Sequence, residues 1–273
     1  MPELPEVESI RRTLEKQVTG QVIKEIQVYW PPSVSGWGEQ SFLSLVNGQR
    51  ITGFSRRGKY LLITLDGGYT LLAHMRMTGR LLYAPDGREP EKHTRVVFLL
   101  ERGELHFWDI RKFGRIQAIP TGLCLSEPVL GKLGPEPLDD GFTPELLQGL
   151  LEGKKSSLKA ALIDQRVVAG IGNIYADEAL YEAGLSPERP AGSLSRPECE
   201  RLRDAIRKVL DAGIVAGGAS IRDYRDGSGN RGRFQETMQV YGRGGKPCYA
   251  CGRPLTRLRL AGRATVYCAN CQS

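Results

Sequence analysis

The chain has 273 residues, of which 40% are hydrophobic and 25% are charged, a globular composition long enough for one large domain or two ordinary ones. No apolar run approaches the roughly 18 residues that a membrane-spanning helix needs. The N-terminus is acidic and amphipathic, unlike a secretory signal. These features exclude a transmembrane protein and favour a cytoplasmic one.

The formal net charge of +7 is concentrated at the C-terminus. Residues 237–273 contain six of the 38 Lys and Arg residues and no Asp or Glu. The remaining 236 residues therefore carry 32 basic against 31 acidic side chains, which is nearly neutral. A basic patch of this kind predicts a polyanionic partner.

The N-terminal sequence MPELPEVES combines proline with two acids. Removal of Met1 would leave Pro2 with a free secondary amine, which can attack an electrophilic carbon and form an iminium. An α-amino group has a pKa near ~8, so part of it is unprotonated at neutral pH. Glu3 and Glu6 follow at once as candidate acids and bases. The alternative interpretation is that these residues only open a helix, because proline and acids suit its first turn.

The first half of the chain changes from a helical to a strand-like pattern. Apolar residues spaced by three and four predict a helix over residues 3–19, closed by Gly20. Strand-like segments separated by Gly-rich turns follow at residues 21–30, 60–65, 69–74, 95–100 and 104–109. They predict a β-sandwich with one helix at its entrance.

The second half is mainly helical. A Pro-, Gly- and acid-rich linker is expected over residues 120–142, after which Thr143 caps a helix. Helical periodicity continues over residues 158–164, 175–183 and 197–212. The polar, Gly-rich segment 217–233 is too long for an ordinary connection, so it is either disordered or a functional lid.

Four cysteines at the C-terminus have metal-site spacing. Cys248, Cys251, Cys268 and Cys271 form a C-x2-C-x16-C-x2-C pattern, which predicts one structural Zn²⁺ bound by four thiolates. Two disulfides are the alternative, which a cytosolic location disfavours. Residues 255–261 and 264–267 between the pairs predict a hairpin with Gly262 and Arg263 at its tip. Cys124 and Cys199 lack partners at metal spacing.

Six motifs in order give the chain a family resemblance over essentially its whole length. They are MPELPEVE at the N-terminus, RRGKY at 56–60, HMRM at 74–77, DIRKFG at 109–114, GIGNIYADEAL at 170–180, and the cysteine pairs. Together they resemble the bacterial formamidopyrimidine-DNA glycosylase family. The resemblance implies an α+β protein with an N-terminal β-sandwich over residues 1–130, a helix–two-turn–helix bundle over 131–236 that includes a lesion-capping loop, and a zinc finger over 237–273.

The resemblance also implies an activity and a catalytic set. It implies a bifunctional glycosylase and AP lyase that excises oxidised purines through a Pro2 Schiff base and then cleaves the strand by β,δ-elimination. Glu3 matches a proton donor. Lys59, in the tight basic turn of the RRGKY motif, matches a phosphate ligand and proton donor, and Arg263 matches a DNA-contacting residue of the catalytic set. Glu6 matches a second active-site carboxylate, with helix capping as its alternative role.

Further residues match positions that contact DNA. Met77, Arg111 and Phe113 match side chains that enter the duplex where the base was extruded, a use of apolar wedges that suits a base-flipping protein. His93, Lys154 and Asn173 match other DNA contacts, and Thr78 is assigned no role.

The expected partner is double-stranded DNA with an oxidised purine opposite cytosine, bound by a monomer. Two alternatives remain. One is an endonuclease VIII-type glycosylase for oxidised pyrimidines, and the other is a zinc-containing DNA-binding protein without catalysis.

Overall fold

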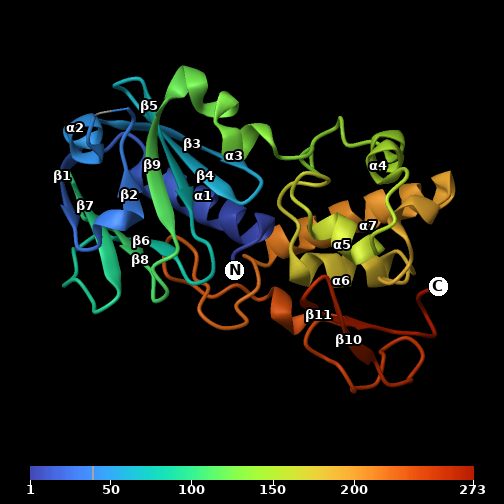
Figure 1. Cartoon of the computed structure of the whole chain (residues 1–273). Coiled ribbons are helices and arrows are strands. Elements are labelled where there is room, and N and C mark those ends of the chain that lie inside the picture. The colour runs from blue at the N-terminus through green and yellow to red at the C-terminus, as the bar shows by residue number, and fades with distance from the viewer. Residues whose placement is uncertain (39) are drawn as a thin grey trace. The chain divides into compact units, whose positions relative to one another are not determined.

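The computed structural model describes residues 1–38 and 40–273 and divides into two compact units (Figure 1). The first unit contains Met1–Gly131 and Ala216–Gln235, and the second contains Lys132–Val215 and Glu236–Ser273. The predicted α+β class is confirmed. The sequence analysis grouped segment 217–233 with the helices, whereas its contacts assign it to the first unit.

The described part of the chain contains the following elements. The strands are β1 (Ile23–Val28), β2 (Val34–Ser35), β3 (Ile51–Arg57), β4 (Tyr60–Leu65), β5 (Tyr69–His74), β6 (Arg80–Ala84), β7 (Thr94–Leu100), β8 (Glu104–Trp108), β9 (Arg115–Pro120), β10 (Thr256–Leu260) and β11 (Arg263–Tyr267). The α-helices are α1 (Leu4–Val18), α2 (Phe42–Val46), α3 (Pro128–Gly131), α4 (Pro144–Leu151), α5 (Leu158–Ile163), α6 (Asn173–Glu182) and α7 (Arg196–Val215). Short 3-10 turns are η1 (Pro31–Ser33), η2 (Thr121–Ser126), η3 (Ala191–Ser193) and η4 (Phe234–Glu236).

The first unit is a sandwich of two sheets with α1 beside them. One sheet has the strand order β1-β7-β8-β6 and the other β2-β9-β5-β4-β3. Strand β2 pairs with β9 in parallel and the other pairs are antiparallel. Leu14 of α1, Leu61 of β4 and Phe98 of β7 belong to one buried cluster. Burying each such side chain contributes about 1.5–3 kcal/mol, which holds the two sheets and the helix together.

The predicted helix and strands are confirmed, and several strands were missed. Strands β4 and β5 have the predicted bounds, and α1 lies within the predicted range 3–19. Strands β3, β6 and β9 carry arginine or glycine among their apolar residues, which weakens the alternating pattern. The predicted linker 120–142 contains η2 and α3.

Two connections cross between the sheets at the same end of the sandwich. Residues 75–79 join β5 to β6, and residues 109–114 join β8 to β9. His74 pairs with Arg115 in one sheet, and Arg80 pairs with Trp108 in the other. The strand registers therefore place these two connections side by side.

The segment 216–235 packs onto α1 and β6. The N–H of Gly227 donates to Thr13 Oγ1 at 2.9 Å, and its carbonyl accepts from the N–H of Tyr83 at 2.8 Å. Tyr224 is buried, and its hydroxyl donates to the carbonyl of Glu6 at 3.2 Å. Of the two predicted possibilities, disorder or a lid, the structure shows an ordered segment fixed to the N-terminal helix.

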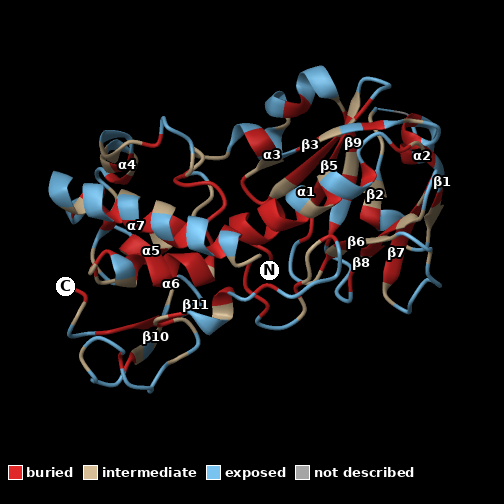
Figure 2. Ribbon diagram, turned by 180° about the vertical axis from the view of Figure 1, so that it is seen from behind, coloured by how far each residue is buried: buried red, intermediate tan, exposed pale blue. Residues whose placement is uncertain are grey.

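The second unit packs α4 and α6 against α7 and adds the C-terminal hairpin. In Figure 2 buried residues (red) run along α5 and α6, and exposed residues (pale blue) mark one side of α7. Thr143 caps α4 as predicted, because its hydroxyl accepts from the N–H of Leu146 at 3.2 Å. Glu178 on α6 is buried and accepts from three successive N–H groups of residues 239–241, which anchors the chain before the hairpin.

The tip of the hairpin differs from the prediction by one residue. Leu260 pairs with Arg263, so the turn consists of Ala261 and Gly262, and Arg263 begins β11. Both turn residues have positive φ, 47° for Ala261 and 73° for Gly262, as in a type I′ turn. The strand pairing selects this turn because its twist matches that of the strands, although alanine is strained in the left-handed region.

Replacing Ala261 should therefore change stability in a direction set by the side chain. Ala261→Asn creates the Asn-Gly pair that this turn favours and should raise the free energy of unfolding by about 0.5–1 kcal/mol. Ala261→Val, which is β-branched, should lower it. Urea unfolding of the zinc-loaded protein measures both changes, and equal midpoints for the two variants would contradict the turn assignment.

Candidate active site and DNA-contacting residues

The N-terminus lies in a buried group of charged side chains. Pro2 is buried, and Glu3, Glu6 and Lys59 are no more than 5% exposed. Burial lowers the pKa of the adjacent Met1 amine below its ordinary value of 8.0. Glu3 and Glu6 raise this pKa, whereas Lys59 and Arg222 lower it further. The fold thus brings the predicted nucleophile, carboxylates and lysine into one electrostatic environment.

Glu6 has both of its proposed roles, because its two oxygens bind different segments. Oε2 accepts from the N–H of Glu3 at 2.8 Å, which caps the start of α1. Oε1 accepts from the N–H of Ala219 at 2.7 Å, which fixes the segment 216–235. Gly218 has a φ of +85°, and a Cβ there would lie 2.9 Å from Glu6 Cγ, so the close approach requires glycine.

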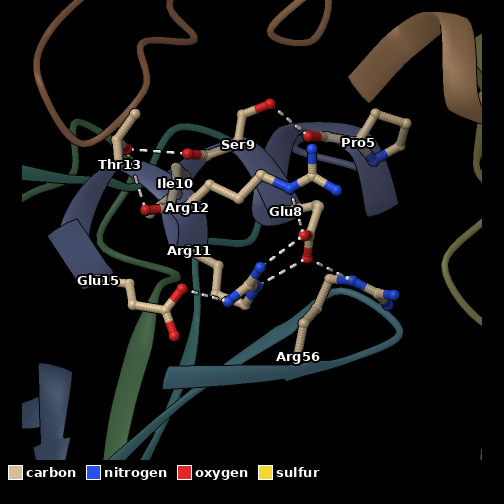
Figure 3. Close-up of polar contacts among 9 residues, drawn as sticks. All are labelled: Pro5, Glu8, Ser9, Ile10, Arg11, Arg12, Thr13, Glu15 and Arg56. Atoms are coloured by element: carbon tan, nitrogen blue, oxygen red, sulfur yellow. Dashed lines mark hydrogen bonds and ion pairs between the residues drawn. The ribbon is translucent and has the colours of Figure 1, made fainter. Parts of the chain in front are cut away.

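Lys59 lies in the predicted tight turn between β3 and β4. Arg57 pairs with Tyr60, which leaves Gly58 and Lys59 as a two-residue hairpin turn. Arg56 supports this turn, since its Nη1 donates to the carbonyl of Gly58 at 3.0 Å. Its Nε lies 3.5 Å from Glu8 Oε2 on α1 (Figure 3).

Glu8 connects α1 to the lysine turn through several arginines. It accepts two hydrogen bonds from Arg11 and one from Arg12, besides its ion pair with Arg56. Burial alone would raise the pKa of Glu8, but the hydrogen bonds from Arg11 and Arg12 lower it below 4.5. A charged Glu8 therefore ties the helix that carries Glu3 to the turn that carries Lys59.

The three predicted duplex-entering side chains lie on the two sheet-crossing connections. Met77 is on the first, and Arg111 and Phe113 are on the second. Met77 is 40% exposed and Phe113 is 49% exposed, which is unusual for apolar side chains beside a well-packed core. The Arg111 guanidinium lies 4.8 Å from the centre of the Phe113 ring. His93 is half-buried, and its ring packs edge-on against Trp108.

The second unit contains the other predicted DNA contacts. Lys154 precedes α5, Asn173 is the first residue of α6, and Arg263 is exposed at the start of β11. Asn173 Nδ2 donates to the carbonyl of Ala264 at 3.0 Å, which links the start of α6 to the residue after Arg263. The positive end of the helix dipole at a helix start suits a phosphate.

A buried ion pair fixes β11 to the helices. Lys159 Nζ lies 2.6 Å from Asp177 Oδ1 and donates to the carbonyl of Ala264 at 2.9 Å. Asp177 Oδ2 accepts from the N–H of Val266 at 3.1 Å. Burial raises the pKa of Asp177 to about 7, and Lys159 opposes this rise. The sequence analysis missed this pair because no motif separates a buried lysine from a solvated one.

The four predicted cysteines converge on one point. Their sulfur atoms all lie within 4.8 Å of one another, with Cys251 and Cys268 3.5 Å apart and Cys248 and Cys271 4.0 Å apart. A disulfide requires about 2.05 Å. Tetrahedral zinc with Zn–S bonds of about 2.3 Å separates its sulfurs by about 3.8 Å, so this donor set fits Zn²⁺.

The structure groups the predicted residues in two sets. The first unit contains the candidate catalytic residues Pro2, Glu3, Glu6 and Lys59 and the predicted DNA contacts His93, Met77, Arg111 and Phe113. The second unit contains Lys154, Asn173, Arg263 and the four cysteines. Glu8, Arg56 and Asp109 also support these residues, although the sequence assigned them no role. Of the three, Asp109 had a usable signal, because an aspartate at the end of a strand and before a glycine-containing turn often binds backbone N–H groups.

Three family models match the chain. They are the formamidopyrimidine-DNA glycosylase N-terminal domain over residues 1–116, the formamidopyrimidine-DNA glycosylase H2TH domain over 133–225, and a zinc finger found in FPG and IleRS over 245–273. In the described residues no helix is long and apolar enough to cross a membrane.

Relatives match over the full chain. The formamidopyrimidine-DNA glycosylase of Desulfitobacterium hafniense is 54% identical over 272 residues, and that of Carboxydothermus hydrogenoformans is 49% identical over 272 residues, with 100% of both chains covered in each case.

Solved structures agree with these matches. A variant of the Lactococcus lactis FPG in complex with Fapy-dG-containing DNA has a TM-score of 0.93 and 37% identity, covering 100% of both chains. The MutM (FPG) protein of Thermus thermophilus has a TM-score of 0.90 and 44% identity, covering 99% of this chain and 98% of that one.

The β-sandwich with its buried Pro2, the H2TH helices and the four-cysteine finger define the architecture of a zinc-containing DNA glycosylase. The chain belongs to the formamidopyrimidine-DNA glycosylase family.

Removing zinc should affect the second unit first. The apolar cluster around the cysteines is small (Val240, Leu255 and Val266 with the partly buried Tyr181), so the hairpin should depend on the metal for its fold. Chelation should abolish DNA binding while the β-sandwich remains folded, as followed by electrophoretic mobility shift and circular dichroism. Arg263→Ala should weaken binding and strand cleavage with the zinc content unchanged. An apo protein that binds damaged duplex normally would contradict this.

Proposed function

We propose that this protein is a bifunctional DNA glycosylase and AP lyase of base-excision repair that removes oxidised purines, including 8-oxoguanine and formamidopyrimidines, from double-stranded DNA. The observation that carries this proposal is that Pro2 is buried with Glu3, Glu6 and Lys59, and that these three charges all act on the adjacent Met1 amine. Similar solved structures support the substrate class. A variant of Lactococcus lactis FPG forms a complex with Fapy-dG-containing DNA, and Lactococcus lactis Fpg forms one with DNA that contains an abasic site.

The reaction begins when the damaged nucleotide is flipped out of the duplex, because its sugar cannot be reached inside the stack. Met1 is absent from the working enzyme, since with Met1 attached the Pro2 nitrogen is an amide and its lone pair is delocalised. The free Pro2 amine attacks C1′ of the sugar, the bond from C1′ to the base breaks, and the base leaves with the electron pair. Glu3 donates a proton to the sugar ring oxygen as the ring opens and the iminium forms.

Strand cleavage follows from the iminium. The positive nitrogen acidifies the C2′ hydrogen, so loss of that proton expels the 3′ phosphate in β-elimination. A second proton loss expels the 5′ phosphate in δ-elimination, and hydrolysis of the remaining iminium regenerates Pro2. Lys59 binds phosphate and donates a proton in these steps, and the contacts of Arg56 with Gly58 and Glu8 support its turn.

The DNA is held by contacts from both units. His93, Lys154, Asn173 and Arg263 bind the backbone, and zinc has a structural role in shaping the hairpin that carries Arg263. Glu6 supports the active site by joining the start of α1 to the segment 216–235, the lesion-capping loop of the proposal. The enzyme acts as a monomer in the bacterial cytoplasm.

Arg111 is the residue proposed to contact the base opposite the lesion. Arginine offers only hydrogen-bond donors. Cytosine presents O2 and N3 as adjacent acceptors, whereas adenine presents N1 beside a donating amino group. A well-placed bidentate contact gives about 1–3 kcal/mol of discrimination, or roughly tenfold to a hundredfold. Met77 and Phe113 fill the space that the flipped base leaves.

One observation favours a broader substrate range as a second candidate. A similar solved structure is Lactococcus lactis FPG (MutM) with DNA that contains an oxidised pyrimidine. Release of 8-oxoguanine and thymine glycol from otherwise identical duplexes separates the candidates. Much faster release of 8-oxoguanine supports the purine enzyme, and comparable release of both bases supports the broader range. Faster release of thymine glycol supports the endonuclease VIII type, and no release supports a DNA-binding protein without catalysis.

Borohydride should trap a covalent adduct between Pro2 and 8-oxoguanine-containing DNA. Intact-mass measurement of the active protein should show the loss of one methionine, and peptide mapping should locate the adduct at residue 2. Pro2→Gln should strongly lower trapping, because the secondary amine that forms the iminium is lost and the chain is left with only a primary α-amine. Trapping of the Pro2→Gln variant at the original level would overturn the assignment.

The pH dependence of trapping should follow the charges around the amine. Burial and the positive charge of Lys59 lower the pKa of the Met1 amine, and we expect the same two effects on the Pro2 amine once Met1 is removed. The unprotonated amine attacks, so the trapping rate should rise with pH to a plateau. Lys59→Gln removes a positive charge, raises this pKa and should move the rising limb to higher pH, and Arg222→Gln should move it less. A shift to lower pH in Lys59→Gln would contradict the electrostatic account.

A further inference from the structure

Two connections carry the side chains proposed to enter the duplex, and one buried carboxylate joins them. Asp109 is fully buried and directly follows β8. Its Oδ2 accepts from the N–H of Gly114 at 2.8 Å, and its Oδ1 accepts from the N–H of Arg111 at 3.2 Å. The carboxylate therefore sets the backbone of the turn on which Arg111 and Phe113 lie.

The same carboxylate reaches the other connection through Thr78. The hydroxyl of Thr78, the residue after Met77, donates to Asp109 Oδ1. Its oxygen also accepts from the N–H of Arg111 at 3.2 Å. The Thr78 hydroxyl thus hydrogen-bonds to the Asp109 carboxylate and to the Arg111 N–H, which also hydrogen-bond to each other. It therefore couples the connection that carries Met77 to the connection that carries Arg111.

The rest of Asp109 is anchored to the sandwich. Its N–H donates to the carbonyl of His93 at 2.9 Å, and its carbonyl accepts from Arg95 Nε at 2.7 Å. A Cβ on Gly114 would lie 2.4 Å from Phe107 Cζ, so this turn is pressed closely onto the core. The junction between the two connections is consequently rigid, although the side chains that it presents are exposed.

Backbone conformation gives a second reason for a rigid junction. Arg76 and Lys112 have positive φ values of 53° and 60°, and they directly precede Met77 and Phe113. Such a conformation is unfavourable for a residue other than glycine and persists only where the surroundings impose it. Here the hydrogen bonds to Asp109 and Thr78 are part of those surroundings.

We propose that Thr78 and Asp109 are positioning residues that hold Met77, Arg111 and Phe113 as one wedge, and that the Thr78 hydroxyl thereby sets the preference for cytosine over adenine opposite the lesion. The inference rests on the proposed function, in which Arg111 contacts the opposite base. An arginine whose backbone is fixed can distinguish two acceptor patterns, whereas one whose backbone shifts adapts to either base.

The test is single-turnover excision of 8-oxoguanine from duplexes with cytosine or adenine opposite the lesion. Thr78→Val keeps the shape of the side chain and removes the hydroxyl, so the ratio of the two rates should fall about threefold to tenfold, the effect of one lost hydrogen bond. Thr78→Ser keeps the hydroxyl and should retain the ratio within about twofold. Thr121→Val is the matched control, because it also removes a threonine hydroxyl bonded to another side chain, Thr70, in the same unit.

A double variant distinguishes coupling through Arg111 from direct contact with the lesion. Arg111→Ala should itself lower the cytosine-to-adenine ratio, and adding Thr78→Val should cause no further fall. If Arg111→Ala lowers the ratio but Thr78→Val does not, or if Thr78→Val acts equally in both backgrounds, the positioning role is wrong. An unchanged ratio in Arg111→Ala would overturn both the reading role and this inference, whereas absence of excision by the unmodified protein would overturn the proposed function itself.

Discussion

The buried carboxylate of Glu6 holds the candidate active site together. Its two oxygens accept from the N–H groups of Glu3 and Ala219, so the start of α1 and a segment more than 200 residues later share one side chain. Burying a carboxylate costs free energy unless it is hydrogen-bonded, so both hydrogen bonds of Glu6 are needed to stabilise this arrangement. The segment 216–235 therefore belongs with the N-terminal helix, although it follows α7 in the chain.

Around this carboxylate the charges oppose one another. Glu3 and Glu6 favour the protonated N-terminal amine, whereas burial, Lys59 and Arg222 favour the neutral form that can attack carbon. Glu8 links α1 to the turn that carries Lys59. Its charged form pairs with Arg56 (Figure 3), and Arg56 in turn donates to the carbonyl of Gly58. The proposed nucleophile and the lysine proposed to bind phosphate are thus supported by the same helix.

The second unit obtains a comparable rigidity from a metal and from buried charge. Four sulfurs at zinc spacing close a small hairpin whose own apolar cluster is slight. Lys159, Asp177 and Asn173 then bind the backbone of β11 beside Arg263. In both units, buried polar groups fix the backbone that carries the exposed side chains proposed to contact DNA. Such preorganisation lowers the entropic cost of binding.

The sequence by itself determined what depends on local pattern: α1, strands β4 and β5, the Gly58–Lys59 turn and the four zinc ligands, because periodicity, turn residues and cysteine spacing act over short distances. Through the family resemblance, the sequence also assigned Pro2, Glu3 and Lys59 to one candidate active site. Only the tertiary structure decided the contact of Glu6 with Ala219, the burial of Lys159 beside Asp177, and the role of Asp109 between two connections. Each of these contacts joins residues that are distant in the chain. The sequence does not show whether an acid or a lysine is solvated or buried, so no local pattern reveals which carboxylates accept hydrogen bonds from backbone N–H groups in the fold.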